Sequence, residues 1–416
     1  MNKRRLETHD IHVGLTLPWN LYNASGKCLF KKGFIIHTDE TIRKMTQLEL
    51  FIEDSAPATA RVAGQRPSPS SALPELDIGR YLDSSEALPF KARRLAPPAN
   101  HVFSEIAHFV AFLELFYTGL IAGERELIPD FLLLINRIQD LLQRDSDSCL
   151  AAVHVYYDFP QSLLQPVYCA LLCEFLGKLM YVEPNHYKRL VASALTANIG
   201  MYEYYDQLVN QKEPLSPEQW AQVRRHPQIG CECLRRVGIQ DALWLKIIEQ
   251  HHERCDGQGY PHGLSRDEIL VEASISGIAD TYLSLIAPKA YRSRQEPIAA
   301  LQSMLKMSIA DDSEILNTFF HASGVFPPGS IVELIDGTIG LVLKRHDKTT
   351  PIPPTCIFAT NSDDRLPNTA LADPGSALHQ FAGIYHGKLP PNIRLHEVYR
   401  TGLRLLSRGK PEQSRP

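Results

Sequence analysis

Residues 243–264, LWLKIIEQHHERCDGQGYPHGL, join an apolar helical pattern to a loop punctuated by glycines. Apolar residues recur at helical spacing up to Ile248, and the adjacent His251 and His252 follow where the pattern ends. Neighbouring residues on a helix point about 100° apart. Both imidazoles therefore reach one site only if the helix frays at this end or if metal ions sit side by side. Paired histidines before such a loop indicate part of a metal site.

The same helical period extends outward over residues 100–325. Apolar residues recur at i, i+3 and i+4 in segments such as 131–145, 165–180 and 272–286. A helix start at Ser216 is marked by a capping serine, a following proline and a glutamine at the capping-box position. Since no strand signals separate these segments, the sequence predicts a mostly α protein with an all-α core domain.

The flanking segments differ from the helical region in composition and in the spacing of their apolar residues, which predicts four parts in the chain. Residues 1–54 contain short β-prone runs broken by turn signals and predict a small β-rich module. Residues 55–99 begin with a stretch rich in proline, serine and alanine and predict a linker. Residues 100–325 form the helical domain. Residues 326–416 predict a β and loop extension with a hairpin around Asp336-Gly337 and one or two further strands.

Composition excludes several classes of protein. A formal net charge of −4 over 416 residues gives no hint of a surface that binds nucleic-acid polymers. Polar residues follow the basic start of the chain, where a signal peptide needs its apolar region. The apolar stretch 106–123 contains His108 and Glu114, and we expect an amphipathic helix on a core rather than a membrane span. Eight cysteines without a C-x-x-C pair favour reduced thiols in a cytoplasmic protein.

Two further residues are candidates to join His251 and His252 at a metal site. His226 is predicted to lie at the end of the helix that begins at Ser216. Asp280 lies within an apolar helical segment, where a carboxylate is costly unless it is paired or bound to metal. Three imidazoles and one carboxylate suit a divalent ion such as Zn, Mn or Fe.

Each candidate also has an alternative that involves no metal, and these alternatives stay open at this point. His226-Pro227 is compatible with a helix-ending turn. Asp280 is compatible with a cap or with an ion pair to Arg292 or Arg294. His252 is compatible with a position exposed to solvent.

The chain resembles the HD-GYP family, bacterial members of the HD superfamily that hydrolyse cyclic di-GMP. The resemblance covers roughly residues 150–345 and rests on three segments in the family's order, which are PLSPEQWAQVRRHPQIGCECL at 214–234, HHERCDGQGYPHGL at 251–264 and ISGIADTYLSLIAPKAYR at 275–292. It implies an HD-superfamily helical domain with a site of two or three metals. It also implies that Gly259, Tyr260 and Pro261 form the name-giving loop, and that Lys289, Tyr291 and Arg292 lie in the substrate-contacting stretch. The β-rich module resembles one that often precedes this domain.

The chain departs from the family where the metal pair is held. The family's signature is His-Asp-Ile-Gly-Lys, and the matching stretch 193–206 reads SALTANIGMYEYYD. Ala197 replaces the histidine, Asn198 the aspartate and Met201 the lysine. Asn198 is neutral, Ala197 offers no ligand, and the lysine that meets a phosphate oxygen in the family has become an uncharged thioether.

Two other positions also depart from the family. Gln161 is the best match to an upstream family histidine, although His154 lies only seven residues earlier. The usual Asp-Ala after the aspartate helix is Leu283-Ser284.

These replacements predict a degenerate HD-GYP protein that acts as a cyclic di-GMP receptor or a protein-interaction module, with at most one divalent ion. One alternative is a metal-dependent cyclic di-GMP phosphodiesterase with a rearranged, weakened site. Another is a scaffold that binds a protein partner without nucleotide or metal. The intact Gly-Tyr-Pro loop is compatible with residual ligand recognition and with a purely structural role.

Overall fold

The computed structural model divides the chain into two compact units, Met1–Glu75 and Leu76–Pro416. It describes residues 78–83, 94–306, 313–347, 349–358, 368–387, 389–390 and 393–408 of the second unit, and residues 3–5, 21–23, 28–30, 45 and 50–53 of the first. The predicted linker stretch 55–76 lies outside these residues. The division of the chain into four parts remains a prediction.

The first unit holds a small antiparallel sheet, which agrees with the predicted β-rich module. Its strand order is β1-β4-β2-β3. The bounds are β1 Lys3–Arg5, β2 Leu21–Tyr22, β3 Cys28–Phe30 and β4 Phe51–Glu53. Leu21 is buried at the centre of this sheet, where β2 pairs with both β3 and β4.

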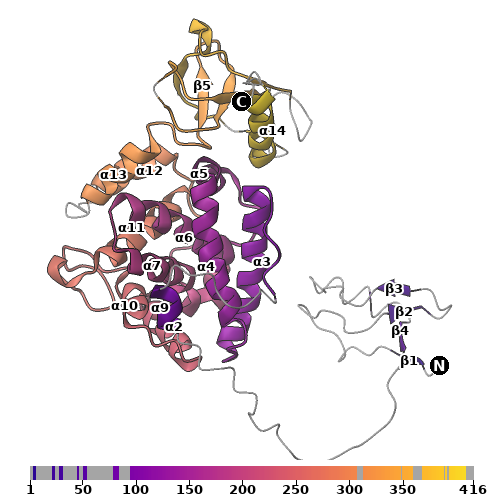
Figure 1. Ribbon diagram of the computed structural model, residues 1–416, viewed down its shortest axis with the longest axis vertical. Helices are drawn as coiled ribbons and strands as arrows, with labels where there is room; N and C mark the ends of the chain where they lie inside the picture. The colour runs from indigo at the N-terminus through magenta and orange to yellow at the C-terminus, as the bar shows by residue number, and fades with distance from the viewer. Residues whose placement is uncertain are drawn as a thin grey trace, which may run out of the picture. The chain divides into compact units, whose positions relative to one another are not determined.

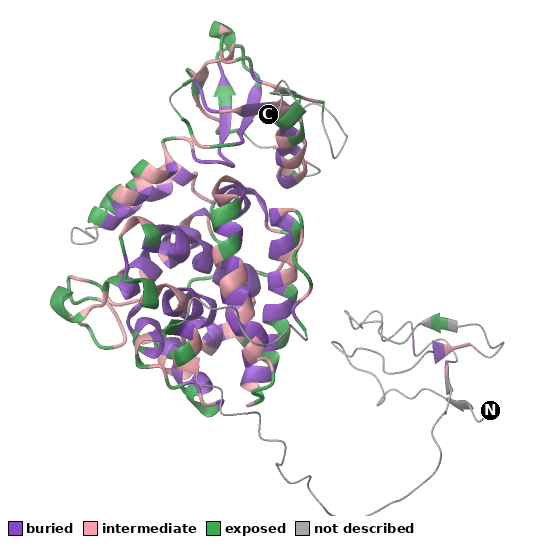
Figure 2. Cartoon of the chain, in the orientation of Figure 1, coloured by how far each residue is buried: buried purple, intermediate pink, exposed green. Residues whose placement is uncertain are grey.

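The second unit is dominated by helices, so the predicted mostly α fold is confirmed. Its helices are α2 Ile78–Asp83, α3 Val102–Ile121, α4 Ile128–Arg144, α5 Ser146–Val155, α6 Gln161–Leu179, α7 Pro184–Thr196, α8 Tyr202–Asn210, α9 Pro217–Arg236, α10 Ala242–Gln250, α11 Val271–Ile286, α12 Pro297–Lys306 and α13 Ser313–Ser323, with a short 3-10 helix, η2, at Ile199–Met201. The helix α6 lies in the middle, against α3, α4, α5, α7 and α11 (Figure 1). Buried residues are concentrated around it (Figure 2).

Within the part of the chain that the structure describes, two helices, α3 and α6, are long and apolar enough to cross a membrane by length and composition alone. Nearly all of α6 is buried inside the helical body, as expected of a core helix. One face of α3 is buried and the other carries exposed residues such as Glu114 and Leu115. The predicted amphipathic helix over 106–123 is therefore confirmed, and it packs on a core.

The C-terminal part forms a five-stranded antiparallel sheet with strand order β8-β7-β6-β5-β9. Its elements are β5 Ile331–Leu334, β6 Ile339–Val342, β7 Thr355–Phe358, β8 Thr369–Leu371, β9 Phe381–Ile384 and the helix α14 Leu395–Arg408. The predicted hairpin is β5 and β6, joined through Gly337 at a positive φ of 80°. The expectation of one or two further strands was too low, because β7, β8 and β9 all pair, and α14 was missed.

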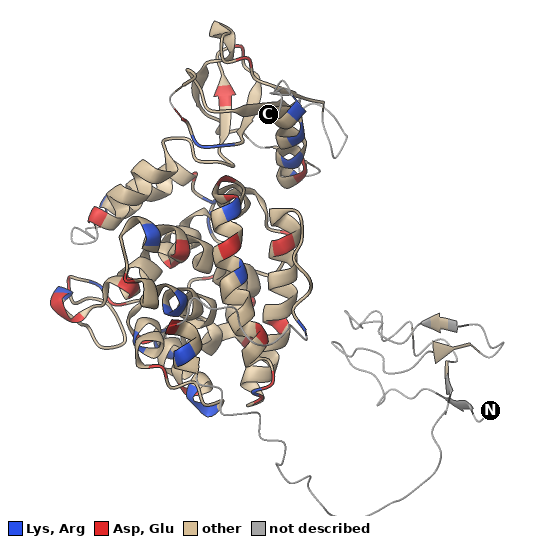
Figure 3. Ribbon diagram, in the orientation of Figure 1, with Lys and Arg blue, Asp and Glu red and all other residues tan. Residues whose placement is uncertain are grey.

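The C-terminal sheet is joined to the helical body by specific polar contacts. Arg345, just after β6, donates from Nε to the Asp147 carboxylate at the start of α5 over 2.6 Å. Tyr399 of α14 is fully buried, donates its hydroxyl proton to the Leu343 carbonyl within the C-terminal part, and lies 3.5 Å from the Ser148 hydroxyl of α5. Basic and acidic residues are interspersed over the helical body (Figure 3), which agrees with the modest net charge.

Candidate metal centre

His226 does not end its helix, contrary to the sequence prediction, because α9 continues through Pro227 to Arg236. A proline inside a helix has no N–H to offer to the carbonyl four residues earlier, here that of Val223. The His226 imidazole takes this place and donates from Nδ1 to the Val223 carbonyl over 2.5 Å. The proline thus leaves an acceptor that fixes the orientation of a buried histidine.

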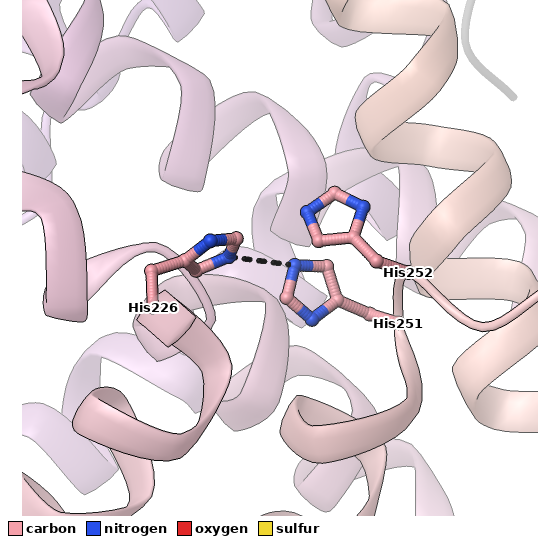
Figure 4. Close-up of side chains that lie close together, drawn as sticks. All are labelled: His226, His251 and His252. Atoms are coloured by element: carbon pink, nitrogen blue, oxygen red, sulfur yellow. Dashed lines mark hydrogen bonds between the residues drawn. The ribbon is translucent and has the colours of Figure 1, made fainter. Parts of the chain in front are cut away.

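His251 and His252 lie immediately beyond α10, which ends at Gln250. Because His252 is outside the helix, the two side chains need not diverge by 100°, and their ring centroids are 4.0 Å apart. The ring of His226 approaches from α9 on the other side (Figure 4). One ligand nitrogen from each of the three residues lies within 4.8 Å of the others. The structure therefore brings the three predicted histidines together.

Hydrogen bonds fix the tautomers of two of these histidines. His251 donates from Nδ1 to the Ile248 carbonyl over 2.6 Å, as His226 does to Val223. A carbonyl only accepts, so in each neutral ring Nδ1 carries the proton and Nε2 has a free lone pair. The two Nε2 atoms face each other at 3.3 Å, joined by the dashed line in Figure 4. Two nitrogen ligands of a tetrahedral zinc lie about 3.4 Å apart, so these atoms are placed as metal ligands are.

Burial keeps the three imidazoles in the neutral form that binds metal. Burial lowers the pKa of His226 well below its usual value, and the neighbouring His252 and His251 lower it further. Burial likewise lowers the pKa of His251, and that of His252 falls well below its usual value. Neutral rings whose ligand nitrogens lie close together fit a divalent cation.

Two glycines allow the backbone to approach these histidines closely. A Cβ on Gly200 would lie 2.2 Å from the His226 carbonyl oxygen. A Cβ on Gly277 of α11 would lie 2.4 Å from the His251 carbonyl oxygen. Gly200, in the stretch that we matched to the family's signature, thus has a packing role beside His226.

Asp280 is hydrogen-bonded to two neutral amides rather than to an arginine. Its Oδ1 accepts from Gln165 Nε2 at 2.7 Å and from Asn198 Nδ2 at 3.1 Å. The pairing with Arg292 or Arg294 that we considered is therefore wrong for the carboxylate as the structure describes it. Asp280 also stands outside the close three-histidine group.

Gln165 is a residue of the site that sequence reasoning missed. We matched Gln161 to the family's upstream position, but Gln161 donates to the Pro288 carbonyl over 2.5 Å. Gln165 lies one helical turn further along α6 and reaches Asp280. The available signal was a glutamine inside the apolar run LLQPVYCALL at 163–172. A polar residue at the centre of a buried helix requires a partner.

The other two replaced residues are buried without polar contacts to the site. Ala197 caps the C-terminal end of α7 and is 2% exposed. Met201 packs with Tyr205 and Val209 in a small apolar cluster. Met201, which we matched to the family's lysine, thus contributes to the packing of α8.

The Gly-Tyr-Pro loop is held both by its own contacts and by the histidines. The ring of Tyr260 stacks on His252 at 4.7 Å between centroids. A Cβ on Gly259 would lie 2.4 Å from the Arg254 backbone nitrogen. Glu253 accepts the backbone N–H groups of His262 and Leu264 at 2.6 and 2.9 Å. These contacts support a structural role and also fix Tyr260 beside the histidines.

Two positively charged side chains in the stretch after α11 donate hydrogen bonds to Ser284. Lys289 donates from Nζ to Ser284 Oγ over 2.7 Å, and Arg292 donates to the Ser284 carbonyl. The ring of Tyr291 is 48% exposed, and Lys289 lies 5.7 Å from its centroid. Ser284, one of the departures from the family pattern, therefore anchors the predicted ligand-contacting residues.

His154 is a structural residue that links α5, α11 and the start of the C-terminal sheet. Its two ring nitrogens lie 2.7 Å from the Pro328 carbonyl oxygen and 2.8 Å from the Tyr282 hydroxyl. Burial lowers the pKa of His154 to about 4. Both nitrogens are thus occupied without metal.

We expect His154 to make stability depend on pH. The unfolded chain binds a proton at the usual pKa of about 6.5, whereas the folded chain resists protonation until about pH 4. Its contribution is therefore complete above about pH 6.5 and is lost as the pH falls toward 4. Between about pH 7 and pH 4.5, the wild type should lose about 2 kcal/mol more unfolding free energy than His154→Gln. Denaturant titrations at both pH values measure this difference, and equal losses would contradict it.

Comparison with known proteins agrees with this description. A family model described as HD domain matches residues 143–313. The chain is 26% identical over 226 residues to the cyclic di-GMP phosphodiesterase PA4108 of Pseudomonas aeruginosa, a match that spans 54% of each protein. It is 27% identical over 194 residues to the cyclic di-GMP phosphodiesterase PdeB of Borreliella burgdorferi, covering 46% of this chain and 50% of PdeB. The chain thus matches about half the length of these curated relatives.

Among solved structures, the chain is similar to Bd1817, an HDG"Y"P protein from Bdellovibrio bacteriovorus. The match has a TM-score of 0.46 and 14% sequence identity, and it covers 76% of this chain and 99% of that one.

Proposed function

We propose, from the HD domain matched over residues 143–313 and from the relatives of the HD-GYP kind, that the protein is a cyclic di-GMP receptor that turns over its ligand poorly or not at all. The ligand class comes from the relatives, which are named as cyclic di-GMP phosphodiesterases. The loss of turnover is our inference from the site of this chain.

One observation carries the proposal: the site is divided into a part suited to metal and a part filled by amides. The Nε2 atoms of His226 and His251 face each other, and one ligand nitrogen of His252 lies within 4.8 Å of them, as ligands of a single divalent ion would. Asp280, which would hold a second ion, accepts hydrogen bonds from Gln165 and Asn198 instead. We therefore expect one ion per chain, bound by the three histidines.

The missing second ion bears directly on hydrolysis. When two metal ions are bound about 4 Å apart, they supply an activated hydroxide and neutralise the charge that develops on the phosphate. In this chain Asn198 lacks the bridging charge, and Met201 cannot meet a phosphate oxygen. Ala197 supplies no ligand either. Each lost electrostatic contact of this kind costs about 3 kcal/mol of barrier, so these three losses should slow hydrolysis by several orders of magnitude.

Ligand recognition is proposed for the segment at 289–292 and for Tyr260. Tyr291 presents a half-exposed ring that can stack on a guanine base, beside the cations Lys289 and Arg292. Stacking of this kind is worth about 1–3 kcal/mol. Tyr291→Ala should therefore weaken cyclic di-GMP binding about 5- to 100-fold without changing the metal content.

Calorimetry and a product assay on the same zinc- or manganese-loaded sample test the proposal. We expect saturable cyclic di-GMP binding, with no pGpG or GMP released above the rate of His251→Ala. Tyr291→Phe is the matched control for Tyr291→Ala, because it keeps the ring. Turnover that depends on His251 would refute the receptor assignment, and an absence of cyclic di-GMP binding would favour a scaffold for a protein partner.

A second candidate, a weak phosphodiesterase with a rearranged site, is favoured by the three-histidine group itself. Three imidazoles and an open position are also the ligand set of mononuclear zinc hydrolases. This candidate requires slow turnover that rises with zinc occupancy and is lost with His226→Ala. A cytoplasmic location and a protein partner that reads the ligand state belong to the proposal as well.

A further inference from the structure

The polar cluster around Asp280 lies outside the three-histidine group and rests on different elements. Gln165 comes from α6, Asn198 from the turn between α7 and η2, and Tyr205 from α8. All four side chains are buried, with exposed fractions of 4–8%. In a site of this family a second cation is implied beside Asp280, so the fit of that cation can be judged from these neighbours.

The orientation of both amides follows from the chemistry of their partners. A carboxylate only accepts hydrogen bonds, so each amide must turn its NH₂ group toward Asp280 Oδ1. Gln165 confirms this orientation at its other end, because its Oε1 accepts the hydroxyl proton of Tyr205. Tyr205 in turn packs with Met201 and Val209. The Gln165 amide is therefore held at both ends.

The Asp280 carboxylate determines the orientation of the Asn198 amide. With its NH₂ group on Asp280, its Oδ1 is buried without a hydrogen-bond partner among the described residues. Leaving such an oxygen unpaired costs about 1–3 kcal/mol. A hydrogen bond to a charged group such as the Asp280 carboxylate contributes about 1.5–3 kcal/mol, which is of the size needed to offset that cost.

A cation that approached Asp280 Oδ1 would meet the NH₂ hydrogen atoms of Gln165 and Asn198 rather than lone pairs. Divalent ions require oxygen or nitrogen acceptors around them. To admit an ion, Gln165 would have to turn its NH₂ group away from Asp280, and Tyr205 would then lose its buried acceptor. The residues present do not fit a second cation.

We propose that Gln165, held by Tyr205, excludes the second cation. The missing His-Asp pair and the Gln165 amide together limit the site to one ion. This inference rests on the one-metal receptor proposed above and identifies the residue that maintains it. Restoring the aspartate by Asn198→Asp alone leaves the Gln165 amide on Asp280. Converting both amides to their isosteric carboxylates removes both donors and creates three adjacent carboxylates that require a cation between them.

Metal content of the purified full-length chain tests this inference. Each protein is stripped with a chelator, dialysed against manganese or zinc and analysed by plasma mass spectrometry. We expect about one ion per chain for the wild type and for Asn198→Asp, and about two for Gln165→Glu with Asn198→Asp. Two ions in Asn198→Asp alone, or one ion in the folded double variant, would overturn the inference.

Gln161→Glu with Asn198→Asp is the matched control, because it adds the same charge one helical turn before Gln165, at a side chain that contacts the Pro288 carbonyl, and should still bind one ion. If the carboxylate double variant does not fold by circular dichroism, Gln165→Ala with Asn198→Asp removes the donor without adding charge, and it should again bind a second ion. Cyclic di-GMP binding by the wild type is measured separately. A metal content that contradicts the role of Gln165 can therefore be distinguished from an absence of ligand binding, which would contradict the receptor proposal.

Discussion

Replacing His251 by alanine should reduce the metal content of the protein from about one ion per chain to almost none. Its Nε2 faces that of His226 at 3.3 Å, and its Nδ1 proton is fixed on the Ile248 carbonyl. Removing it leaves only two imidazoles, which hold a divalent ion weakly. Losing even a residue that only orients a metal ligand costs about 10- to 100-fold in affinity, so loss of a ligand should exceed 100-fold.

A metal-dependent rise in thermal stability gives a second readout of the same change. An ion that binds only the folded chain at about 1,000 times its dissociation constant adds about 4 kcal/mol to the unfolding free energy. Zinc should therefore raise the melting temperature of the wild type but not that of His251→Ala. His262→Ala is the control, since this histidine is exposed in the same loop. A His251→Ala protein that keeps its ion would disprove the three-histidine site.

Gly200→Ala should destabilise the folded chain by about 3 kcal/mol or more, although it adds a single methyl group. The new Cβ would lie 2.2 Å from the His226 carbonyl oxygen and 2.9 Å from the Gly230 backbone nitrogen. Both contacts are backbone atoms of α9, so no side chain can rotate away and the helix must shift. Overpacking of this kind typically costs about 1–3 kcal/mol, and more where the backbone must move.

The shift should also reach the metal site, because the displaced backbone carries His226. We expect Gly200→Ala to lose metal affinity together with stability, as followed by denaturant titration and by zinc binding. Gly383→Ala in β9 is the matched control, since no atom lies within 4 Å of its added Cβ, and it should change stability by less than about 1 kcal/mol. Equal stability of the two variants would show that α9 does not pack on Gly200 as described.

The helical body was predictable because its signals are local and repeated. Apolar spacing predicted the helices around α6, and the capping box at Ser216 is present. Local sequence signals were misleading at Pro227, because a proline after histidine was interpreted as the end of a helix. Only the structure shows that the carbonyl released by this proline is taken up by His226. The helix α14 was missed because the surrounding proline-rich segments suggested loops.

The candidate ligands of the proposed metal site were predictable from the sequence, but the hydrogen-bond partners of Asp280 were not. The three histidines were identified from residue type and spacing, together with the family resemblance. The bonds of Asp280 join α6, the turn before η2 and α11, which lie up to 115 positions apart in the sequence. No local pattern determines which buried amide reaches such a carboxylate, so Gln165 was overlooked in favour of Gln161. Contacts of this kind depend on how the helices pack.

The most direct test is a crystal grown with manganese and measured at an energy where that metal scatters anomalously. One anomalous peak per chain is predicted, bonded to imidazole nitrogens of His226, His251 and His252, with the Gln165 amide still on Asp280. Two peaks a few ångströms apart, with the second on Asp280, would contradict the one-ion site and with it the proposed loss of turnover.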